Sequence, residues 1–265
     1  MNAARTAGTL EVDGRPIAYE TEGSGRPIVL LHGGLADNTT WAAQFAGLGR
    51  TRRVVAPERQ GHGHTPDAPG PLTYQAMADE TLAVLTALDL GPVDLLGWSD
   101  GGMVGLLLAA QHPGAVRTLS VTGTGFASTG YVPGAIEALT ALPLDDPELA
   151  PFAAMHARAS PDGAAHFGVL WAKVRALWAE PFDWSGDLGR ITAPLLVIVG
   201  DDDYVRVGHA ETLARSVRAG QLAVVPGASH LVPIEKPELF NRLVLEFTAG
   251  PAVSTMTALW RAPPP

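Results

Sequence analysis

The sequence contains no cysteine. Disulfides, thiolate metal sites, iron–sulfur clusters and a cysteine nucleophile are therefore excluded. Lysine is nearly absent, with only Lys173 and Lys236, and 18 basic side chains face 27 acidic ones, which gives a formal net charge of -9. Because binding to nucleic acid or to an anionic membrane requires clustered positive charge, we expect neither partner.

Long apolar runs are also missing. No stretch approaches the roughly 20 apolar residues that span a bilayer, and the first twenty residues lack the apolar core of a secretory signal. We therefore expect a cytoplasmic protein. The 265 residues, 46% hydrophobic and 17% charged, are typical of a globular chain with a well-buried core. Disorder is expected only at the two ends, most clearly at Trp260 to Pro265.

Short runs of β-branched and leucine residues stop at glycine, and each is followed by a segment with helical spacing. This alternation predicts an α/β fold with a mostly parallel sheet. Before these runs, Leu10 to Val12 and Ile17 to Glu20 flank Asp13-Gly14, which predicts an antiparallel hairpin. With it we expect about eight strands, the other six being Pro27 to Leu31, Arg53 to Ala56, Val93 to Trp98, Thr118 to Thr122, Pro194 to Val199 and Leu222 to Val225.

Helices are predicted between the strands, where they can cover both faces of the sheet. They are Thr39 to Leu48, Thr73 to Leu88, Gly102 to Gln111, His209 to Arg218 and Pro237 to Phe247. The sixty residues after Phe126 contain helical patterns and many aromatic side chains but no convincing strand. We expect a core built from residues 1–125 and 187–250, a helical cap at 126–186, and a C-terminal tail at 251–265.

The segment Gly97-Trp98-Ser99-Asp100-Gly101 matches the pattern G-x-S-x-G between a predicted strand and a predicted helix. Such a sharp turn strains the serine backbone, and the residues two before and two after it must be small. The Ser99 hydroxyl is then exposed above the sheet, at the positive end of the helix. The alternative is an ordinary glycine-rich turn without chemistry.

A serine hydroxyl needs a base and an orienting carboxylate to act as a nucleophile. Of the eight histidines, His230 follows the last predicted strand, in a loop that could reach Ser99. The acid is expected at the same edge of the sheet, where Asp201, Asp202 and Asp203 follow one strand directly. One of the three can face His230. A cation site is the alternative, although the usual calcium-loop pattern is absent.

Two backbone N–H groups could stabilise the oxyanion of such a reaction. The turn His32-Gly33-Gly34 offers one, and the amide of Asp100 offers the other. No motif implies a cofactor or a metal, and we expect neither.

In this order along the chain, the motifs resemble the serine-nucleophile branch of the α/β-hydrolase fold superfamily, over nearly the whole length from Leu10 to Phe247. The resemblance implies that Asp203, third after Gly200, is the acid and that Gly34 supplies the loop amide. The segment from Glu58 to Thr65 is similar to the family pattern D-x-x-G-x-G-x-S, with Glu for Asp and Thr for Ser. It implies structural roles for the histidines within it.

Branches of this family that open epoxides or displace halide carry Asp where this chain has Ser99. The resemblance therefore implies a carboxylesterase-like enzyme that cleaves a small to medium ester, thioester or lactone. The Gly-Trp-Ser-Asp-Gly-Gly stretch also resembles a branch that includes amino-acid-ester hydrolases such as valacyclovir hydrolase. Asp100 could then bind a substrate ammonium, or it could only stabilise the helix start. Trp98 could contact substrate or pack beneath the turn.

Two further hypotheses remain open. The same residues could serve hydrolysis of a carbon–carbon bond in a diketone, perhydrolase chemistry or the tailoring of a biosynthetic intermediate. A protein of this fold could also bind a ligand without turnover. The aromatic cap favours an apolar pocket for a small-molecule, ester-like substrate. The sequence does not indicate an oligomeric state.

Overall fold

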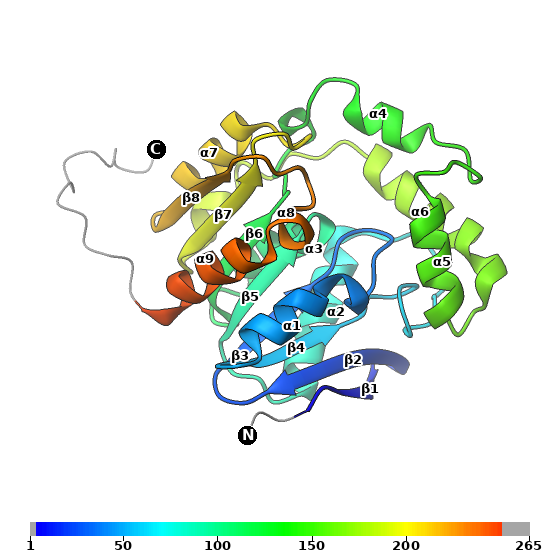
Figure 1. Ribbon diagram of the computed structural model, residues 1–265, viewed down its shortest axis with the longest axis horizontal. Coiled ribbons are helices and arrows are strands. Elements are labelled where there is room, and N and C mark those ends of the chain that lie inside the picture. The colour runs from blue at the N-terminus through cyan, green and yellow to red at the C-terminus, as the bar shows by residue number, and fades with distance from the viewer. Residues whose placement is uncertain (1–3, 251–265) are drawn as a thin grey trace.

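A single eight-stranded sheet forms the centre of the computed structural model, which describes residues 4–250 (Figure 1). The strand order is β1-β2-β4-β3-β5-β6-β7-β8. The strands are β1 (Thr6–Val12), β2 (Arg15–Gly23), β3 (Pro27–Leu31), β4 (Arg53–Pro57), β5 (Val93–Trp98), β6 (Val116–Thr122), β7 (Leu195–Gly200) and β8 (Gly220–Val225). β2 pairs antiparallel with β1 and β4, and all other pairs are parallel. The predicted fold class is confirmed.

The central strands are apolar on both faces because helices cover both faces. Every residue of β5 and β7 is buried. Along β3 the side chains alternate: Ile28 and Leu30 join one hydrophobic cluster, while Val29 and Leu31 join another on the opposite face. The strand order reverses between β3 and β5. In open α/β sheets, ligands usually bind at the carboxyl ends of the strands at such a point.

The helices form one layer on each side of the sheet (Figure 1). Trp41, Phe45 and Phe240 pack one layer against the sheet, and Met103 and Leu213 pack the other. The first layer holds α1 (Ala42–Leu48), α8 (Val232–Glu235) and α9 (Pro237–Ala249), and the second holds α2 (Tyr74–Ala87), α3 (Asp100–Gln111) and α7 (Val207–Ser216). Short 3-10 turns lie at Asn38–Trp41, Ser128–Gly130, Ala164–His166 and Leu188–Arg190.

Three helices lie between β6 and β7: α4 (Ala135–Thr140), α5 (Ala150–Ala159) and α6 (Phe167–Ala179). They stand beside the layered core, on the right in Figure 1. The inner side chains of α6, Leu170, Trp171 and Val174, belong to the same hydrophobic cluster as the core helices. An ion pair of 2.6 Å between Lys173 Nζ and Asp67 also links α6 to the loop after β4.

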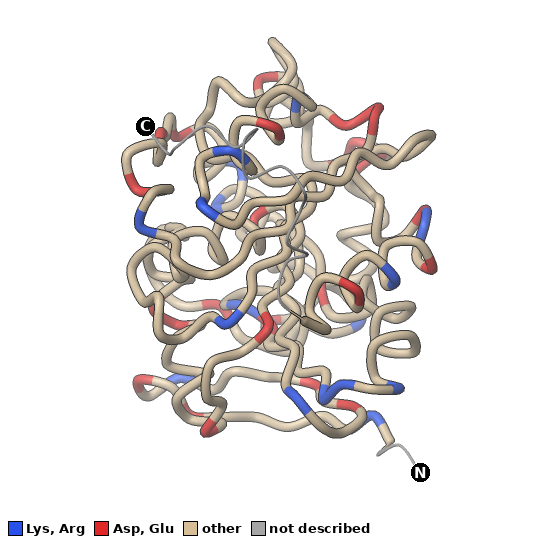
Figure 2. The backbone as a smooth tube through the Cα atoms, turned by 90° about the vertical axis from the view of Figure 1, so that its left-hand side faces the viewer, with Lys and Arg blue, Asp and Glu red and all other residues tan. Residues whose placement is uncertain are grey.

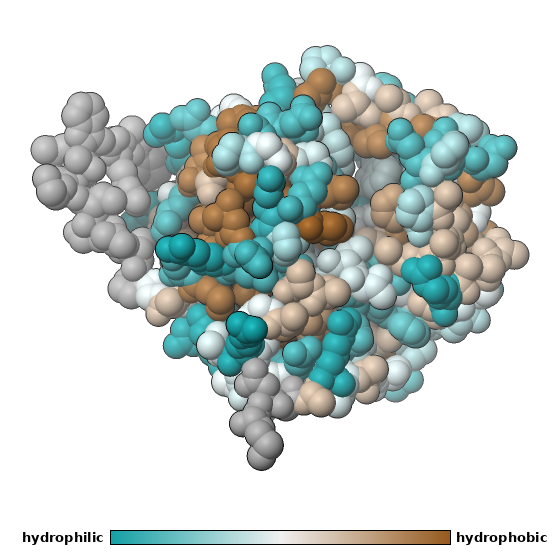
Figure 3. Space-filling view, in the orientation of Figure 1, coloured by the Kyte–Doolittle hydropathy of each residue, from teal (hydrophilic) through white to brown (hydrophobic). Residues whose placement is uncertain are grey.

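Basic and acidic residues are interspersed along the backbone in the view of Figure 2. Apolar side chains gather instead over β8, α8 and α9 (Figure 3), where Leu222, Val224, Ile234 and Leu239 are exposed. None of the helices described is long and apolar enough to cross a membrane. The predicted tail at 251–265 lies outside the described residues.

Candidate active site

Ser99 occupies the turn between β5 and α3 in a strained backbone conformation, with φ at 55° and ψ at -121°. Few residues other than glycine adopt a positive φ. The two neighbouring glycines are required by contact: a side chain at Gly101 would meet the carbonyl of Leu31, and one at Gly97 would meet the carbonyl of Gly101. The helix therefore begins at Asp100, two residues earlier than predicted, directly after the serine.

His230 and Asp203 form a hydrogen-bonded pair, with 2.9 Å between Nδ1 of His230 and Oδ1 of Asp203. The Asp203 side chain is fully buried, and its Oδ1 also accepts the amide proton of Val205. Among the described residues, Nε2 of His230 has no hydrogen-bond partner. A proton on Nδ1 faces the carboxylate, which leaves the lone pair of Nε2 available to take a proton.

The geometry distinguishes between the three aspartates that follow β7. Only Asp203 reaches His230. Asp201 and Asp202 are exposed, and Asp201 accepts the amide proton of Ala228. On the other side of His230 lies Gly123, whose φ is 58°; a Cβ there would lie 2.6 Å from Cε1 of the imidazole. Glycine at this position makes room for the ring.

Trp98, the residue before Ser99, contacts both the core and His230. Its indole Nε1 donates a 2.9 Å hydrogen bond to the carbonyl oxygen of His230, and its ring packs edge-on against Trp41. The side chain is 4% exposed and also lines the pocket at Ser99. Trp98 therefore positions the His230 loop, a role beyond the two that the sequence suggested.

Tyr204 was not identified from the sequence. Its ring stacks on the imidazole of His230, with centroids 4.0 Å apart, and its side chain lies close enough to that of Ser99 for the serine to lower the tyrosine's pKa slightly. Burial, and then the charge of Asp203, raise the pKa of Tyr204 well above its usual value, so the phenol keeps its proton. The only feature of the sequence that could have pointed to Tyr204 as a site residue is its position directly after Asp203.

A pocket of about 240 Å³ lies over this arrangement. Ser99, His230 and Tyr204 lie on its wall. Most of the remaining wall is apolar, and of the residues lining it only Glu148 has an ionisable side chain apart from those just named. The insertion between β6 and β7 supplies Leu139, Leu142, Leu149, Phe152, Trp171 and Trp178.

The family model for the alpha/beta hydrolase family matches residues 28–243 of this sequence. The chain belongs to the alpha/beta hydrolase family. It is 32% identical to a 2-hydroxy-6-oxo-2,4-heptadienoate hydrolase of Pseudomonas putida, with 86% of this chain and 91% of that protein covered. It is 29% identical to a putative carbamate hydrolase, RutD, of a Caulobacter strain, over 91% and 98%. A thermophilic esterase from Thermogutta terrifontis has 26% identity and a TM-score of 0.72, over 92% and 98%.

Asp100 is the residue at which this alpha/beta hydrolase was expected either to bind an ammonium or to stabilise a helix start. Its carboxylate is 4% exposed and accepts hydrogen bonds from the Tyr74 hydroxyl, at 2.9 Å, and from the indole of Trp178, at 3.0 and 3.1 Å. It is absent from the residues that line the pocket. This placement supports a structural role, in which Asp100 joins α6 of the insertion to the start of α3.

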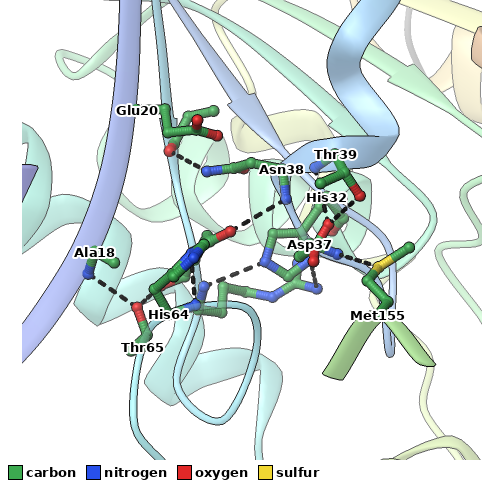
Figure 4. Close-up of polar contacts among 12 residues, drawn as sticks. Ala18, Glu20, His32, Asp37, Asn38, Thr39, His64, Thr65 and Met155 are labelled. Carbon is green, nitrogen blue, oxygen red and sulfur yellow. Dashed lines mark hydrogen bonds and ion pairs between the residues drawn. The ribbon is translucent and has the colours of Figure 1, made fainter. Parts of the chain in front are cut away.

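The family segment after β4 departs from its usual pattern, yet its hydrogen bonds are formed. Thr65 Oγ1 accepts the amide proton of Ala18 and donates to the carbonyl of Glu58, while the Glu58 carboxylate accepts the amides of His64 and Asn38 (Figure 4). Burial raises the pKa of Glu58. The histidines of this segment make protein contacts. Within residues 4–250, no three His, Asp or Glu side chains are grouped so as to share a metal ion.

The two backbone amides expected at the oxyanion position, those of Gly34 and Asp100, lie at the ends of β3 and β5. Neither makes a hydrogen bond to another described residue. Gly34 lines the pocket, and a Cβ on Gly33 would lie 3.5 Å from Cβ of Ser99. The β3 loop is thus adjacent to the serine.

Proposed function

We propose that this protein hydrolyses uncharged carboxylic esters of small to medium size through an acyl-enzyme on Ser99. The observation that carries the proposal is the pocket of about 240 Å³, which contains Ser99 and the Asp203-paired His230 within an apolar wall. Pockets for drug-sized ligands start near 300 Å³, so a short acyl or alkoxy group fits this one best. Thioesters and lactones present the same carbonyl chemistry.

In this mechanism Nε2 of His230 takes the proton of Ser99 as Oγ attacks the carbonyl carbon. Asp203 holds the imidazole by Nδ1 and stabilises the imidazolium that forms. The amides of Gly34 and Asp100 donate to the oxyanion of the tetrahedral intermediate. The alcohol leaves with the proton from His230, and water then attacks the acyl-enzyme with the same histidine as base.

Charge distinguishes esters from the main alternative. The relative that is 32% identical is named for an acid with a 6-oxo group, which carries a carboxylate. No Lys or Arg lines the pocket described here, and Glu148 on its wall would repel such an anion. The esterase and the putative carbamate hydrolase among the similar proteins act, by their names, on ester or carbamate groups. Both observations favour an uncharged acyl substrate over cleavage of a carbon–carbon bond.

The test is stopped-flow hydrolysis of p-nitrophenyl acetate, butyrate, hexanoate and dodecanoate, with mono-p-nitrophenyl succinate as the anionic comparison. We expect butyrate or hexanoate to be preferred and the succinate to be at least tenfold poorer. Ser99→Ala should abolish turnover and fluorophosphonate labelling, whereas Ser216→Ala, on α7, should retain both. Turnover that survives Ser99→Ala would refute the acyl-enzyme, and a preference for the succinate would refute the substrate class.

A further inference from the structure

Arg59 places a positive charge in the protein interior beside the β3 loop. Its side chain is 3% exposed, although arginine is rarely buried unless it is paired. The guanidinium donates to two consecutive carbonyls of that loop, to His32 at 2.6 Å and to Gly33 at 2.8 Å. Burial lowers the pKa of Arg59, and the negative charge of Asp100 acts in the opposite direction. These contacts tie the buried charge to the loop that carries Gly34.

The hydrogen bond from Arg59 to the Gly33 carbonyl also orients the N–H of Gly34, because both groups belong to one peptide unit. A trans peptide is planar, so the carbonyl of Gly33 and the N–H of Gly34 point in opposite directions. A donor that fixes the carbonyl on one side therefore aims the N–H to the other side. Gly34 lines the pocket that contains Ser99, and its amide is free of other described partners.

His32 provides a second donor to the same carbonyl. Its Nε2 accepts the backbone amide proton of Arg59 at 3.2 Å, so the ring proton of the neutral imidazole is on Nδ1. Nδ1 lies 2.8 Å from the carbonyl oxygen of Gly33 and donates to it. Burial and the charge of Arg59 hold the pKa of His32 well below its usual value, so the ring stays neutral and carries one proton.

His62 occupies the backbone amide of Leu35, which would otherwise compete with that of Gly34 for a ligand. The N–H of Leu35, the next residue, donates to Nε2 of His62 at 3.2 Å, and Nδ1 of that ring lies 2.8 Å from the carbonyl of Gln60. Leu35 has a φ of 59°, which turns the chain away after Gly34. Of the two consecutive amides of Gly34 and Leu35, the one on Gly34 is therefore available to a ligand.

We propose that Arg59 is a positioning residue for the oxyanion hole: its guanidinium, together with His32, fixes the Gly33–Gly34 peptide so that the Gly34 N–H faces the reacting carbonyl. The charge-assisted hydrogen bond also polarises that peptide and strengthens the N–H as a donor. The inference rests on the proposed function, because Gly34 meets an oxyanion only if Ser99 attacks a carbonyl.

The first experiment compares the kinetics of Arg59→Met and Arg59→Lys with those of the full-length wild type on p-nitrophenyl butyrate. Since the oxyanion forms only in the transition state, kcat should fall about 10- to 100-fold in Arg59→Met, with KM within about twofold. Arg59→Lys keeps the charge but loses the paired N–H donors of the guanidinium, so its kcat should lie between those of the wild type and Arg59→Met. Arg15→Met is the matched control: Arg15 bonds to Gln60 of the same segment, and its loss should leave kcat within about twofold.

The second experiment reads the Gly34 amide directly by two-dimensional NMR, without turnover. We expect its resonance to shift or broaden in both Arg59 variants and to stay unchanged in Arg15→Met. A wild-type kcat with an unmoved Gly34 resonance, in either Arg59 variant, overturns the proposal. If Arg59→Met does not fold, Arg59→Lys decides by the same criteria. Absence of ester turnover in the wild type would instead contradict the proposed function, and the Gly34 resonance would still test Arg59.

Discussion

The strained turn at Ser99 should lower the stability of the folded protein by a measurable amount. A residue other than glycine in such a conformation costs about 1–3 kcal/mol, and φ at 55° with ψ at -121° places Ser99 in it. Replacing Ser99 by Ala keeps the strain, whereas replacing it by Gly relieves it. In an ordinary conformation Gly is about 0.5–1 kcal/mol less stable than Ala. The two effects oppose each other, so Ser99→Gly should exceed Ser99→Ala in unfolding free energy by about 1 kcal/mol.

A control separates the strain from the intrinsic cost of glycine. Ala154 is exposed in the middle of α5, where Ala154→Gly should lower stability by about 0.5–1 kcal/mol. Subtracting the Ala-to-Gly change at residue 154 from that at residue 99 should return the strain itself, about 1–3 kcal/mol. Because neither position 99 variant retains the hydroxyl, catalysis does not enter the comparison.

Urea denaturation of the four proteins at pH 8 provides the unfolding free energies, and thermal scans provide a second reading. For a chain of this size, 1 kcal/mol corresponds to a change of about 2–4 °C in Tm. A difference of zero between the two sites, or a Ser99→Gly protein less stable than Ser99→Ala, would refute the claim that the turn is strained.

Three further predictions concern stability in acid, the glycine beside His230, and Tyr204. Burial lowers the pKa of His62 to about 3 and that of His209 to about 4, below the unfolded value of 6.5, so unfolding takes up protons in acid. Stability should be complete above pH 6.5 and fall by about 2 kcal/mol per histidine by pH 5, as measured by urea denaturation at both pH values; an unchanged midpoint would contradict this. In Gly123→Ala the new methyl group would displace the imidazole of His230, so kcat should fall about 100-fold with KM little changed. Full activity in a folded variant would disprove the contact. Tyr204→Phe keeps the ring stack but loses the hydroxyl that interacts with Ser99, so kcat should fall about 5- to 10-fold, and less than in Tyr204→Ala; equal rates for the two variants would argue against the stack.

Local patterns in the sequence were sufficient to predict the sheet and the sharp turn at Ser99. Strands that end at glycine before helical segments predicted the eight strands, and Gly97 and Gly101 predicted a close approach that the structure contains. The choice of Asp203 among three consecutive aspartates had no basis in spacing and came from a family resemblance. The structure reaches the same residue through contact, since only its carboxylate meets His230.

Contacts between distant segments could not be predicted in this way. Trp178 meets Asp100 across 78 positions, and Arg59 meets the loop 26 and 27 positions before it. No local period relates such residues, because their meeting depends on how the insertion and the β4 loop fold over the sheet. The helical pattern also put the start of α3 at Gly102, since Asp100 and Gly101 were assigned to the turn; the helix in fact begins immediately after Ser99.

The order of the reactive groups along the chain has a consequence for synthesis. Ser99 and the glycines of its turn are translated early, whereas His230, the base in the proposed mechanism, is translated 131 residues after Ser99. Trp98 and Gly123, which contact His230 in the folded protein, are also translated long before it. A growing or truncated chain that stops before residue 230 carries the serine without a group to deprotonate it. Under the proposed mechanism, such a chain would not form an acyl-enzyme at Ser99, and reactivity would begin only once residue 230 is in place.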